Sequence, residues 1–422
     1  MKTRLTIKHT HFYINDTIIY GDIPGCPEEK KGLLMNARFI QGIFDEKNDV
    51  NRFNRFGRKF DPAVNVDQMI DALPEWHEFG LRAITVGFQG GGPCYTVDST
   101  TMNNNPFSED GTKIEEAYLE RMYKVIRAAD EIGMIVIVSL FYCTQSQYLK
   151  DDAAVIEATK TASNWLKNIK ATNVIIEIAN EHDVESYKVH PILYNDRGIV
   201  ELIQIAQRES GGIPVGCSGT GAYFSESIGK ASDVILIHGN NQTRQQFYNH
   251  IMQAKAIKPA KPIVCNEDSQ ALSQMEVALK NGVSWGYYNN MTKQEPPVNW
   301  KITKGEDFYF AVRMAEALGI KKNELPLEDQ FYLQGFEPEM QYDGKRWIRL
   351  ACLYPERINY VNFYRNGKLE ATAYDDPFTI NFLFNWLQKP VINIHQDEEW
   401  TAEIILADGI KILKKVIVNN NQ

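Results

Sequence analysis

Eight short apolar segments, separated by segments of mixed character, are the feature that most restricts the fold of this chain. A strand buried on both faces reads as a continuous apolar run, and such strands belong to parallel sheets covered by helices. The alternation therefore predicts a parallel α/β architecture. The runs are LLMNARFI from Leu33, LRAITVGF from Leu81, MIVIVSLFY from Met134, NVIIEIAN from Asn173, IPVGCSG from Ile213, DVILIHGN from Asp233, PIVCNED from Pro262 and VSWGYYN from Val283.

Helical patterns separate the runs, and the number of units indicates one arrangement. The segment that precedes the third run places Met122 and Ile126 on an apolar stripe, and Gly133 follows as a stop signal. Eight strand–helix units within residues 1–320 fit a (β/α)8 TIM barrel, which needs about 250 residues or more. An open, doubly wound sheet is the structural alternative. Long polar loops follow the first two runs, at the end of the strands where barrel enzymes build their sites.

The two ends of the chain have a β pattern instead. Residues 5–20 predict a hairpin around the turn pair Asn15-Asp16, which could cap the bottom of a barrel. Residues 321–332 have the character of a linker, and residues 333–422 predict a small all-β sandwich. The turn pairs predicted within this sandwich are Asn366-Gly367 and Asp408-Gly409.

The charge balance and the lack of long apolar runs limit the possible partners. Lys and Arg number 45 and Asp and Glu number 54, so the formal net charge is −9, which disfavours binding to nucleic acid. No run approaches the roughly 18 apolar residues of a transmembrane helix. The first residues lack the apolar core of a signal peptide, so the expectation is a cytosolic protein or one whose signal has been removed.

Two motifs that bind cofactors or metals in other proteins lack the context that they need. Gly90-Gly91-Gly92 follows a predicted strand, but neither a Lys-Ser/Thr pair nor a GxGxxG frame accompanies it, so we interpret it as a tight turn. His9 and His11 form an HxH pair on the predicted N-terminal hairpin, away from the end of the first barrel strand. We therefore expect neither a cofactor nor a metal ion.

Two glutamates end buried runs, and an asparagine precedes each. Glu181 follows Asn180 after the fourth run, and Glu267 follows Asn266 in the seventh. Strands four and seven of a barrel lie roughly across its mouth, so we expect the two carboxyls to converge. Cleavage of a glycosidic bond uses such a pair, in which one carboxyl protonates the leaving oxygen and the other attacks the anomeric carbon or activates water. Glutamates that merely face solvent at strand ends are the alternative.

This pattern resembles the clan of retaining (β/α)8 glycosidases, clan A, in which Asn-Glu follows strand four and a glutamate follows strand seven. The resemblance covers roughly residues 1–320 and implies that Glu181 is the acid/base, that Glu267 is the nucleophile and that Asn180 holds the 2-hydroxyl of the sugar. An LLMNAR start and an HGN motif are similar to bacterial proteins of this type, which implies a periplasmic or extracellular protein. No numbered family is assigned.

The C-terminal segment VNFYRNGKLEATAYDDPFTINF resembles bacterial immunoglobulin-like modules. The resemblance implies an immunoglobulin-like sandwich over residues 333–422 that packs on the catalytic domain as a spacer. Binding of polysaccharide by this module is the alternative.

Further residues within the runs or at their ends are candidates for binding the sugar. His238 ends the sixth run, where it could hydrogen-bond the nucleophile or a hydroxyl, with a core histidine as the alternative. Arg38 needs an acceptor if buried and would keep a nearby carboxylate ionised, with a structural ion pair as the alternative. Trp285 could stack on a sugar ring or pack in the core. The remaining candidates are Gln89, Tyr142, Asn240 and Asp268, the last with loop orientation as its alternative.

The expectation is thus a monomeric glycoside hydrolase that acts on an oligo- or polysaccharide, and two other classes stay open. A degenerate barrel could bind carbohydrate without cleaving it, which a carboxyl separation beyond about 10 Å would favour. A metal-dependent barrel hydrolase is the second class, and loss of activity on chelation would favour it.

Overall fold

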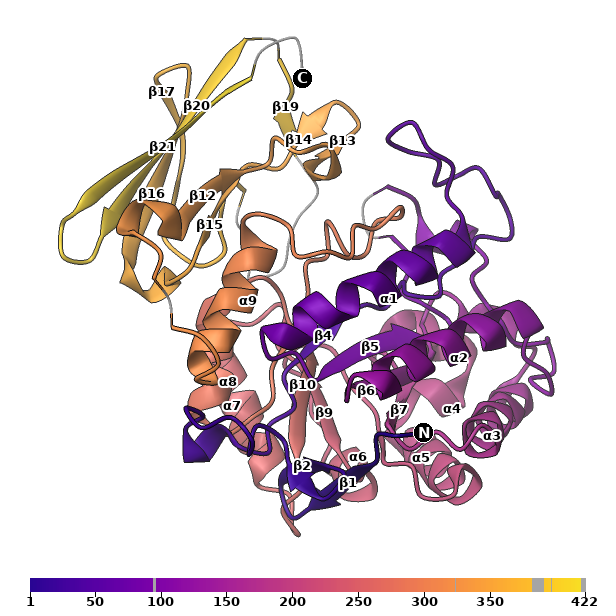
Figure 1. The fold of residues 1–422 in the computed structure, drawn as a ribbon. Helices are drawn as coiled ribbons and strands as arrows, with labels where there is room; N and C mark the ends of the chain where they lie inside the picture. Colours follow the sequence, from indigo (N-terminus) through magenta and orange to yellow (C-terminus); the bar gives the residue numbers. More distant parts are fainter. Residues whose placement is uncertain (94–95, 323, 382–390, 396, 419–422) are drawn as a thin grey trace.

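Eight parallel strands form the centre of the N-terminal part (Figure 1). The computed structural model describes residues 1–93, 96–322, 324–381, 391–395 and 397–418. Each predicted run contains one strand, which confirms the α/β interpretation of this part. The strands are β4 (Asn36–Arg38), β5 (Ala83–Gly87), β6 (Ile135–Phe141), β7 (Val174–Ala179), β8 (Val215–Gly216), β9 (Ile235–His238), β10 (Ile263–Glu267) and β11 (Gly286–Tyr287).

The strands are paired in the order in which they occur in the chain. A six-stranded parallel sheet has the order β11-β4-β5-β6-β7-β8, so the eighth strand lies beside the first. β9 and β10 form a parallel pair, and a bridge between Val264 and Ser284 connects β10 to the segment before β11. Between β8 and β9 the Asp233 amide donates to the Val215 carbonyl at 2.8 Å. This cyclic order fits a (β/α)8 fold, and a continuous ladder through all eight strands stays a prediction.

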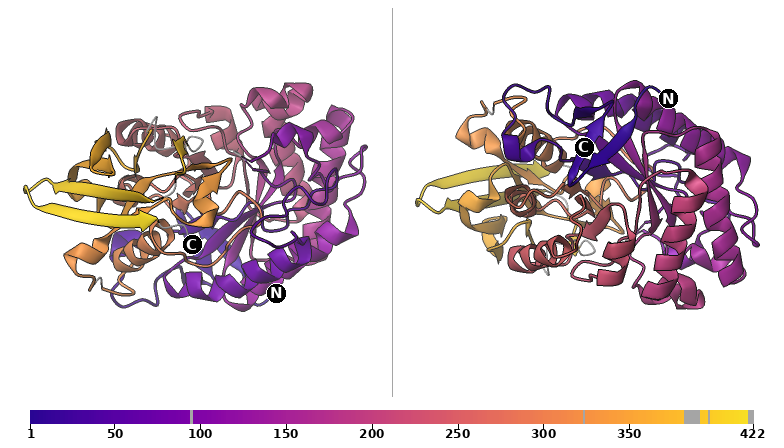
Figure 2. Two further views of the ribbon diagram at one scale, coloured as in Figure 1. Left: turned by 90° about the horizontal axis from the view of Figure 1, so that it is seen from above. Right: turned by 90° about the horizontal axis from the view of Figure 1, so that it is seen from below.

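Helices cover the outer side of these strands, as the two views of Figure 2 show. Asp61 caps the first of them by accepting hydrogen bonds from the Ala63 and Val64 amides. Met122 and Ile126 are buried on the inner face of the second, as their spacing predicts. The helices are α1 (Pro62–Glu78), α2 (Glu116–Glu131), α3 (Asp152–Asn168), α4 (Pro191–Tyr194), α5 (Asp196–Ser210), α6 (Glu226–Ala231), α7 (Arg244–Lys255), α8 (Leu272–Lys280) and α9 (Glu306–Ala317).

The N-terminal segment forms three antiparallel strands, although its sequence predicts one hairpin. The expected turn at Asn15-Asp16 is present, and a second turn lies at His9, which has a φ of 57°. His9 and His11 therefore do not share one strand face. The Leu5 amide donates to the Thr172 carbonyl just before β7, so this sheet lies at the N-terminal end of that strand. The strands are β1 (Leu5–Lys8), β2 (His11–Ile14) and β3 (Thr17–Ile18).

The described residues of the C-terminal part form β-strands and short 3₁₀ turns, and they have a hydrophobic core of their own, which includes Val361, Phe363 and Trp400. Its sheets have the orders β12-β15-β18, β13-β14-β19 and β17-β16-β20-β21. An immunoglobulin-like topology stays a prediction. The strands are β12 (Phe331–Gln334), β13 (Gln341–Tyr342), β14 (Lys345–Arg346), β15 (Arg349–Cys352), β16 (Ile358–Arg365), β17 (Lys368–Ala373), β18 (Phe378–Thr379), β19 (Ile392–Asn393), β20 (Glu398–Leu406) and β21 (Lys411–Val418).

The turn pairs of this part lie where the sequence predicts them. Asn366-Gly367 joins β16 to β17, and Asp408-Gly409 joins β20 to β21. β12 begins at Phe331, inside the segment 321–332 that we interpret as a linker, and Phe331 belongs to the C-terminal core. Among the residues that the structure describes, no helix has the length and apolar character that crossing a membrane would require.

Buried ion pairs hold the loop after β11 and connect the two parts. Arg349 of β15 pairs with Glu306 at the start of α9. In the loop after β11, Lys293 Nζ lies 2.8 Å from Asp307 Oδ2, and both side chains are buried. Burial raises the pKa of Asp307. The charge of Lys293 and the hydrogen bonds that neighbouring side chains donate to Asp307 lower the pKa by more, so it lies below its ordinary value. The pair therefore holds the loop after β11 in place. Gln294, which follows Lys293 in this loop, lines the candidate site.

Replacing Lys293 with methionine is expected to lower the free energy of unfolding by about 3–5 kcal/mol, because Asp307 is left buried without its cation. Urea denaturation followed by tryptophan fluorescence measures the change. Lys280→Met, at an exposed position of α8, is the matched control and should change stability by less than about 0.5 kcal/mol. Adding Asp307→Asn should recover part of the loss. A cost below about 1 kcal/mol for Lys293→Met would contradict the assignment.

Candidate active site

Glu181 lies two residues beyond the end of β7, the fourth of the eight strands. The Asn180 amide makes the last hydrogen bond to β6, at the Phe141 carbonyl. Glu181 then adopts a φ of 50°, a left-handed conformation that costs a residue with a Cβ about 1–2 kcal/mol. The Glu181 amide donates to Ser218 Oγ at 3.2 Å, which holds this turn in place. Its side chain is 21% exposed, so this residue of the site is partly open to solvent.

Glu267 is the last residue of β10, the seventh strand, and is almost fully buried. The pairing of β10 with β9 shifts between Cys265 and Glu267, a bulge of the kind that redirects a side chain. One carboxylate oxygen lies 2.6 Å from Arg38 Nε, and the other accepts a hydrogen bond from Asn240 Nδ2 at 2.8 Å. Both oxygens of Glu267 are thus held in fixed directions.

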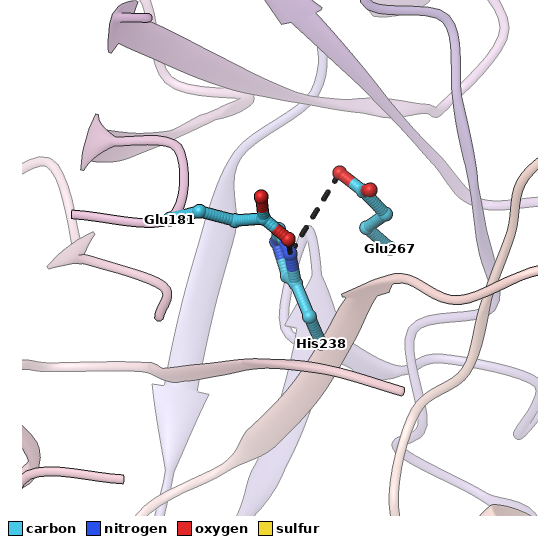
Figure 3. A group of neighbouring side chains, drawn as sticks. All are labelled: Glu181, His238 and Glu267. Carbon is cyan, nitrogen blue, oxygen red and sulfur yellow. Dashed lines mark hydrogen bonds and ion pairs between the residues drawn. The ribbon is translucent and has the colours of Figure 1, made fainter. Parts of the chain in front are cut away.

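His238, the last residue of β9, lies between the two glutamates (Figure 3). Its Nδ1 is 3.0 Å from Glu181 Oε1 and 3.7 Å from Glu267 Oε2. One atom from each of the three residues lies within 4.8 Å of the others. The predicted convergence of the carboxyls is therefore present in the structure, and the separation beyond about 10 Å that would favour a binding protein is not.

Burial and charge act against each other in this group. Burial raises the pKa of Glu267 above its ordinary value, although Arg38 and His238 oppose the rise and Glu181 adds to it. For His238, burial disfavours the charged ring, but Glu267 and Glu181 outweigh burial and raise the pKa. The protonation of Glu267 and that of His238 therefore depend on each other.

A third carboxylate, that of Glu177, lies below Glu181 and Glu267 and was not among the sequence candidates. Glu177, in the middle of β7, is fully buried and accepts hydrogen bonds from Ser218 Oγ at 2.7 Å and Asn266 Nδ2 at 2.8 Å. Arg38 Nη2 donates to Asn180 Oδ1 at 2.5 Å above it. A glutamate inside the apolar run NVIIEIAN is the signal that could have indicated Glu177, because a charge on a doubly buried strand needs partners.

A cavity of about 460 Å³ opens over the two glutamates. Of the predicted binding residues, Arg38, Tyr142 and Asn240 line it, and Asn180 and His238 are buried beside its glutamates. Further lining residues that the sequence analysis did not single out are Tyr288, Thr220 and Gln294.

Three other candidates are absent from the described lining of the cavity. Gln89 accepts from the Tyr142 amide at 2.9 Å and so supports a lining residue from behind. Trp285 is fully buried, its ring lies 5.7 Å from that of Phe310, and its Nε1 donates to Asp268 at 2.7 Å. Burial raises the pKa of Asp268 to about 8. Trp285 therefore packs in the core, the alternative stated for it, and Tyr142 and Tyr288 are aromatic residues of the cavity.

Glu181, His238 and Glu267 also form a group that could hold a metal ion. The Arg38 guanidinium lies 2.6 Å from the Glu267 oxygen that faces His238, and its positive charge repels a second cation at this place. The donor set therefore suits proton transfer and attack by a carboxylate better than it suits a metal.

Comparisons with known proteins bear on this site. Residues 50–203 match the family model Cellulase (glycosyl hydrolase family 5), which is less than half of the chain and includes Glu181 but not Glu267. No curated protein matches the chain. A proposed glycoside hydrolase from Bacteroides vulgatus ATCC 8482 has a similar structure, with a TM-score of 0.51 and 10% identity over 99% of this chain and 76% of that one.

Two more solved structures are similar at lower scores. Parabacteroides merdae β-glucuronidase has a TM-score of 0.41 and 11% identity over 99% of this chain and 50% of its own. A β-mannanase from the blue mussel Mytilus edulis has a TM-score of 0.46 and 13% identity over 75% of this chain and 97% of its own. The chain spans about half the length of the β-glucuronidases that it matches. At these identities the likeness concerns the fold.

The family match and the paired glutamates on this fold indicate glycoside hydrolase activity. The matched family belongs to clan A of the glycoside hydrolases, and the chain itself is not assigned to a family.

Proposed function

We propose that the protein cleaves a glycosidic bond by double displacement, with Glu267 as the nucleophile and Glu181 as the acid/base. The observation that carries the proposal is that one carboxylate oxygen of Glu181 and one of Glu267 lie within 4.8 Å of each other. Retaining enzymes keep their carboxyls about 5–5.5 Å apart, whereas inverting enzymes need about 6.5–9.5 Å to admit a water molecule. The narrow separation supports direct attack by one carboxylate on the anomeric carbon.

The surroundings of each glutamate support this division of roles. Glu267 has Arg38 on one oxygen and Asn240 on the other, and these donors favour its anionic form and fix its direction of attack. Glu181 is more exposed and has His238 as its hydrogen-bond partner on Oε1, so it can exchange a proton with the leaving group and then with water. Asn180, held by Arg38, would bind the 2-hydroxyl next to the reacting carbon.

We propose a neutral sugar for the position beside the glutamates. Arg38 is the cation among the described lining residues, and Glu267 and Asn180 already occupy two of its nitrogens. The other charged lining residues are the two glutamates, which repel a carboxylate on the substrate. A uronic acid would therefore meet no exposed cation among the described lining residues, although several of the similar structures are β-glucuronidases.

The wild-type protein is expected to hydrolyse at least one neutral glycoside in a panel of 4-nitrophenyl α- and β-glycosides, and to be at least about tenfold less active on the matching glucuronide. Proton NMR of the first product is expected to show the anomeric configuration of the substrate. The assay includes a sample treated with a chelator, which should keep full activity. Product of the opposite configuration would exclude the double displacement, and a folded protein without activity on any glycoside would exclude the proposal as a whole.

We further propose that the eight strands close into a barrel and that the C-terminal part is an immunoglobulin-like spacer. The lateral contact of β11 with β4 supports closure. The antiparallel order β17-β16-β20-β21 and the separate hydrophobic core support a sandwich.

A further inference from the structure

A second hollow, of about 680 Å³, lies between the two parts of the chain and is larger than the cavity over the glutamates. One wall is formed by α7 and α8. The other is formed by the 3₁₀ turn Pro355–Arg357, the start of β16 and the segment between β17 and β18. α8 packs against the 3₁₀ turn, so the two walls are in direct contact at one side of the hollow. Ligand sites form preferentially at such boundaries between two packed units.

Each wall presents an exposed tyrosine to this hollow. Tyr248 of α7 is 41% exposed, and Tyr374, after β17, is 66% exposed. The Tyr374 ring lies 5.7 Å from that of Tyr360, so it has an aromatic neighbour on its own wall. Exposed tyrosine rings offer an apolar face and a polar edge, which is the combination that a pyranose ring needs for stacking and hydrogen bonding. Their exposure on both sides of one hollow indicates a ligand that lies between them.

The backbone that carries Tyr374 is held in place from the opposite wall. Asp376 Oδ2 accepts a hydrogen bond from the Ser273 amide at the start of α8, at 3.0 Å. This hydrogen bond joins the two walls of the hollow. The hollow is therefore a built feature and does not depend on a free loop.

The polar groups of the hollow suit a neutral ligand. The amide side chains of Gln245, Gln274 and Asn281 line it, and Gln274 Oε1 has no hydrogen-bond partner among the described residues although the side chain is buried. The charged lining residues have mixed signs, so neither a polyanion nor a polycation is favoured. They are Arg244, Lys280, Glu356, Asp375 and Asp376.

We propose that this hollow is a second carbohydrate-binding site, which takes a neutral oligosaccharide chain between Tyr248 and Tyr374. It is separate from the cavity over the glutamates and does not require that Glu181 and Glu267 be catalytic. The two sites are close in the fold, because Gln242 lines the hollow and its Nε2 donates to the His238 carbonyl at 2.8 Å. A polymer held in the hollow would thus be kept near the site of cleavage, which raises its local concentration there.

The test uses the full chain with Glu267→Gln, so that oligosaccharides are bound and not consumed. Isothermal titration with the β-1,4-linked hexasaccharides of glucose, mannose and xylose is expected to give two sites per chain for at least one of them. In the Tyr248→Ala/Tyr374→Ala variant, one site should be lost or weakened at least tenfold. Tyr123→Ala is the matched control, because this tyrosine is 43% exposed on α2 and should leave both sites unchanged.

Turnover of a small substrate distinguishes a loss of binding in the hollow from a change in the cavity over the glutamates. In the chain with Glu267 intact, the tyrosine double variant should keep kcat/KM for an activated aryl glycoside within about twofold, because that substrate does not reach the hollow. Binding of no hexasaccharide, or binding only at a site that the tyrosine double variant leaves unchanged, would overturn the site in the hollow. An unchanged second site in the double variant, or an equal loss of aryl glycoside turnover, would overturn it as well.

Discussion

Replacing Glu267 with glutamine is expected to lower kcat by about 10⁴- to 10⁶-fold on the best glycoside of the panel, which is the range for loss of a nucleophile. The amide keeps the size of the side chain but cannot form a glycosyl ester with the anomeric carbon. Initial rates of 4-nitrophenol release measure the effect. Glu120→Gln, at an exposed position of α2, is the matched control and should retain wild-type kcat.

The fold of the Glu267→Gln variant has to be measured beside its activity. Arg38 and Asn240 each donate to one carboxylate oxygen, and glutamine offers one acceptor where Glu267 offers two. We therefore expect some loss of stability together with an unchanged circular dichroism spectrum at room temperature. Burial raises the pKa of Glu267 and therefore disfavours its charged form. A neutral glutamine at this position should cost less stability than it would in place of a carboxylate whose pKa burial does not raise. A folded variant with more than about 1% of wild-type kcat would contradict the nucleophile assignment.

Replacing Glu181 with alanine is expected to reduce kcat/KM by about 10²- to 10⁴-fold for glycosides with poor leaving groups, such as oligosaccharides. The loss should be less than about tenfold for a 2,4-dinitrophenyl glycoside. Such a phenolate leaves without a proton, so the first step needs no acid, and only the later activation of water is affected. Steady-state rates across a series of leaving groups measure the dependence, which should be steeper in the variant than in the wild type.

The same variant tests whether Glu181 acts as the base of the second step. A small anion such as azide can take the place of water in attack on the glycosyl ester and needs no base. Added azide should therefore raise turnover of the activated glycoside in Glu181→Ala and leave the wild type unchanged. Equal losses on all leaving groups, or no response to azide, would assign Glu181 a structural role. His238, which contacts both carboxylates, would then be the remaining candidate for proton transfer.

The strands of the N-terminal part could be predicted because the burial of each strand can be recognised from its own residues. A run such as MIVIVSLFY has no charged residue and does not alternate apolar with polar positions, so it belongs between helices whatever its neighbours are. The N-terminal segment was predicted less well. It forms three short strands where one hairpin was expected, because His9 adopts a left-handed turn that no Gly or Asn signals.

The candidate site could be predicted in part for the same reason. A carboxylate at the end of an apolar run is conspicuous, and Glu181 and Glu267 do converge. Gln89 follows a run and Trp285 lies within one, and the structure places Trp285 in the core and Gln89 behind Tyr142. Which way a side chain at a strand end points depends on bulges and on the twist of the neighbouring strands, and neither is visible in a local pattern.

The sequence by itself determined the eight strand–helix units, the β character of both ends and the two glutamates on the fourth and seventh strands. The tertiary structure decided that Arg38, Asn240 and His238 surround those glutamates, that Glu177 lies beneath them, and that Tyr248 and Tyr374 face one hollow. Secondary structure follows from interactions between residues a few positions apart, which a sequence displays directly. Burial, charge and the pKa values of the site arise between residues from different strands, and these meet only after the strands have packed.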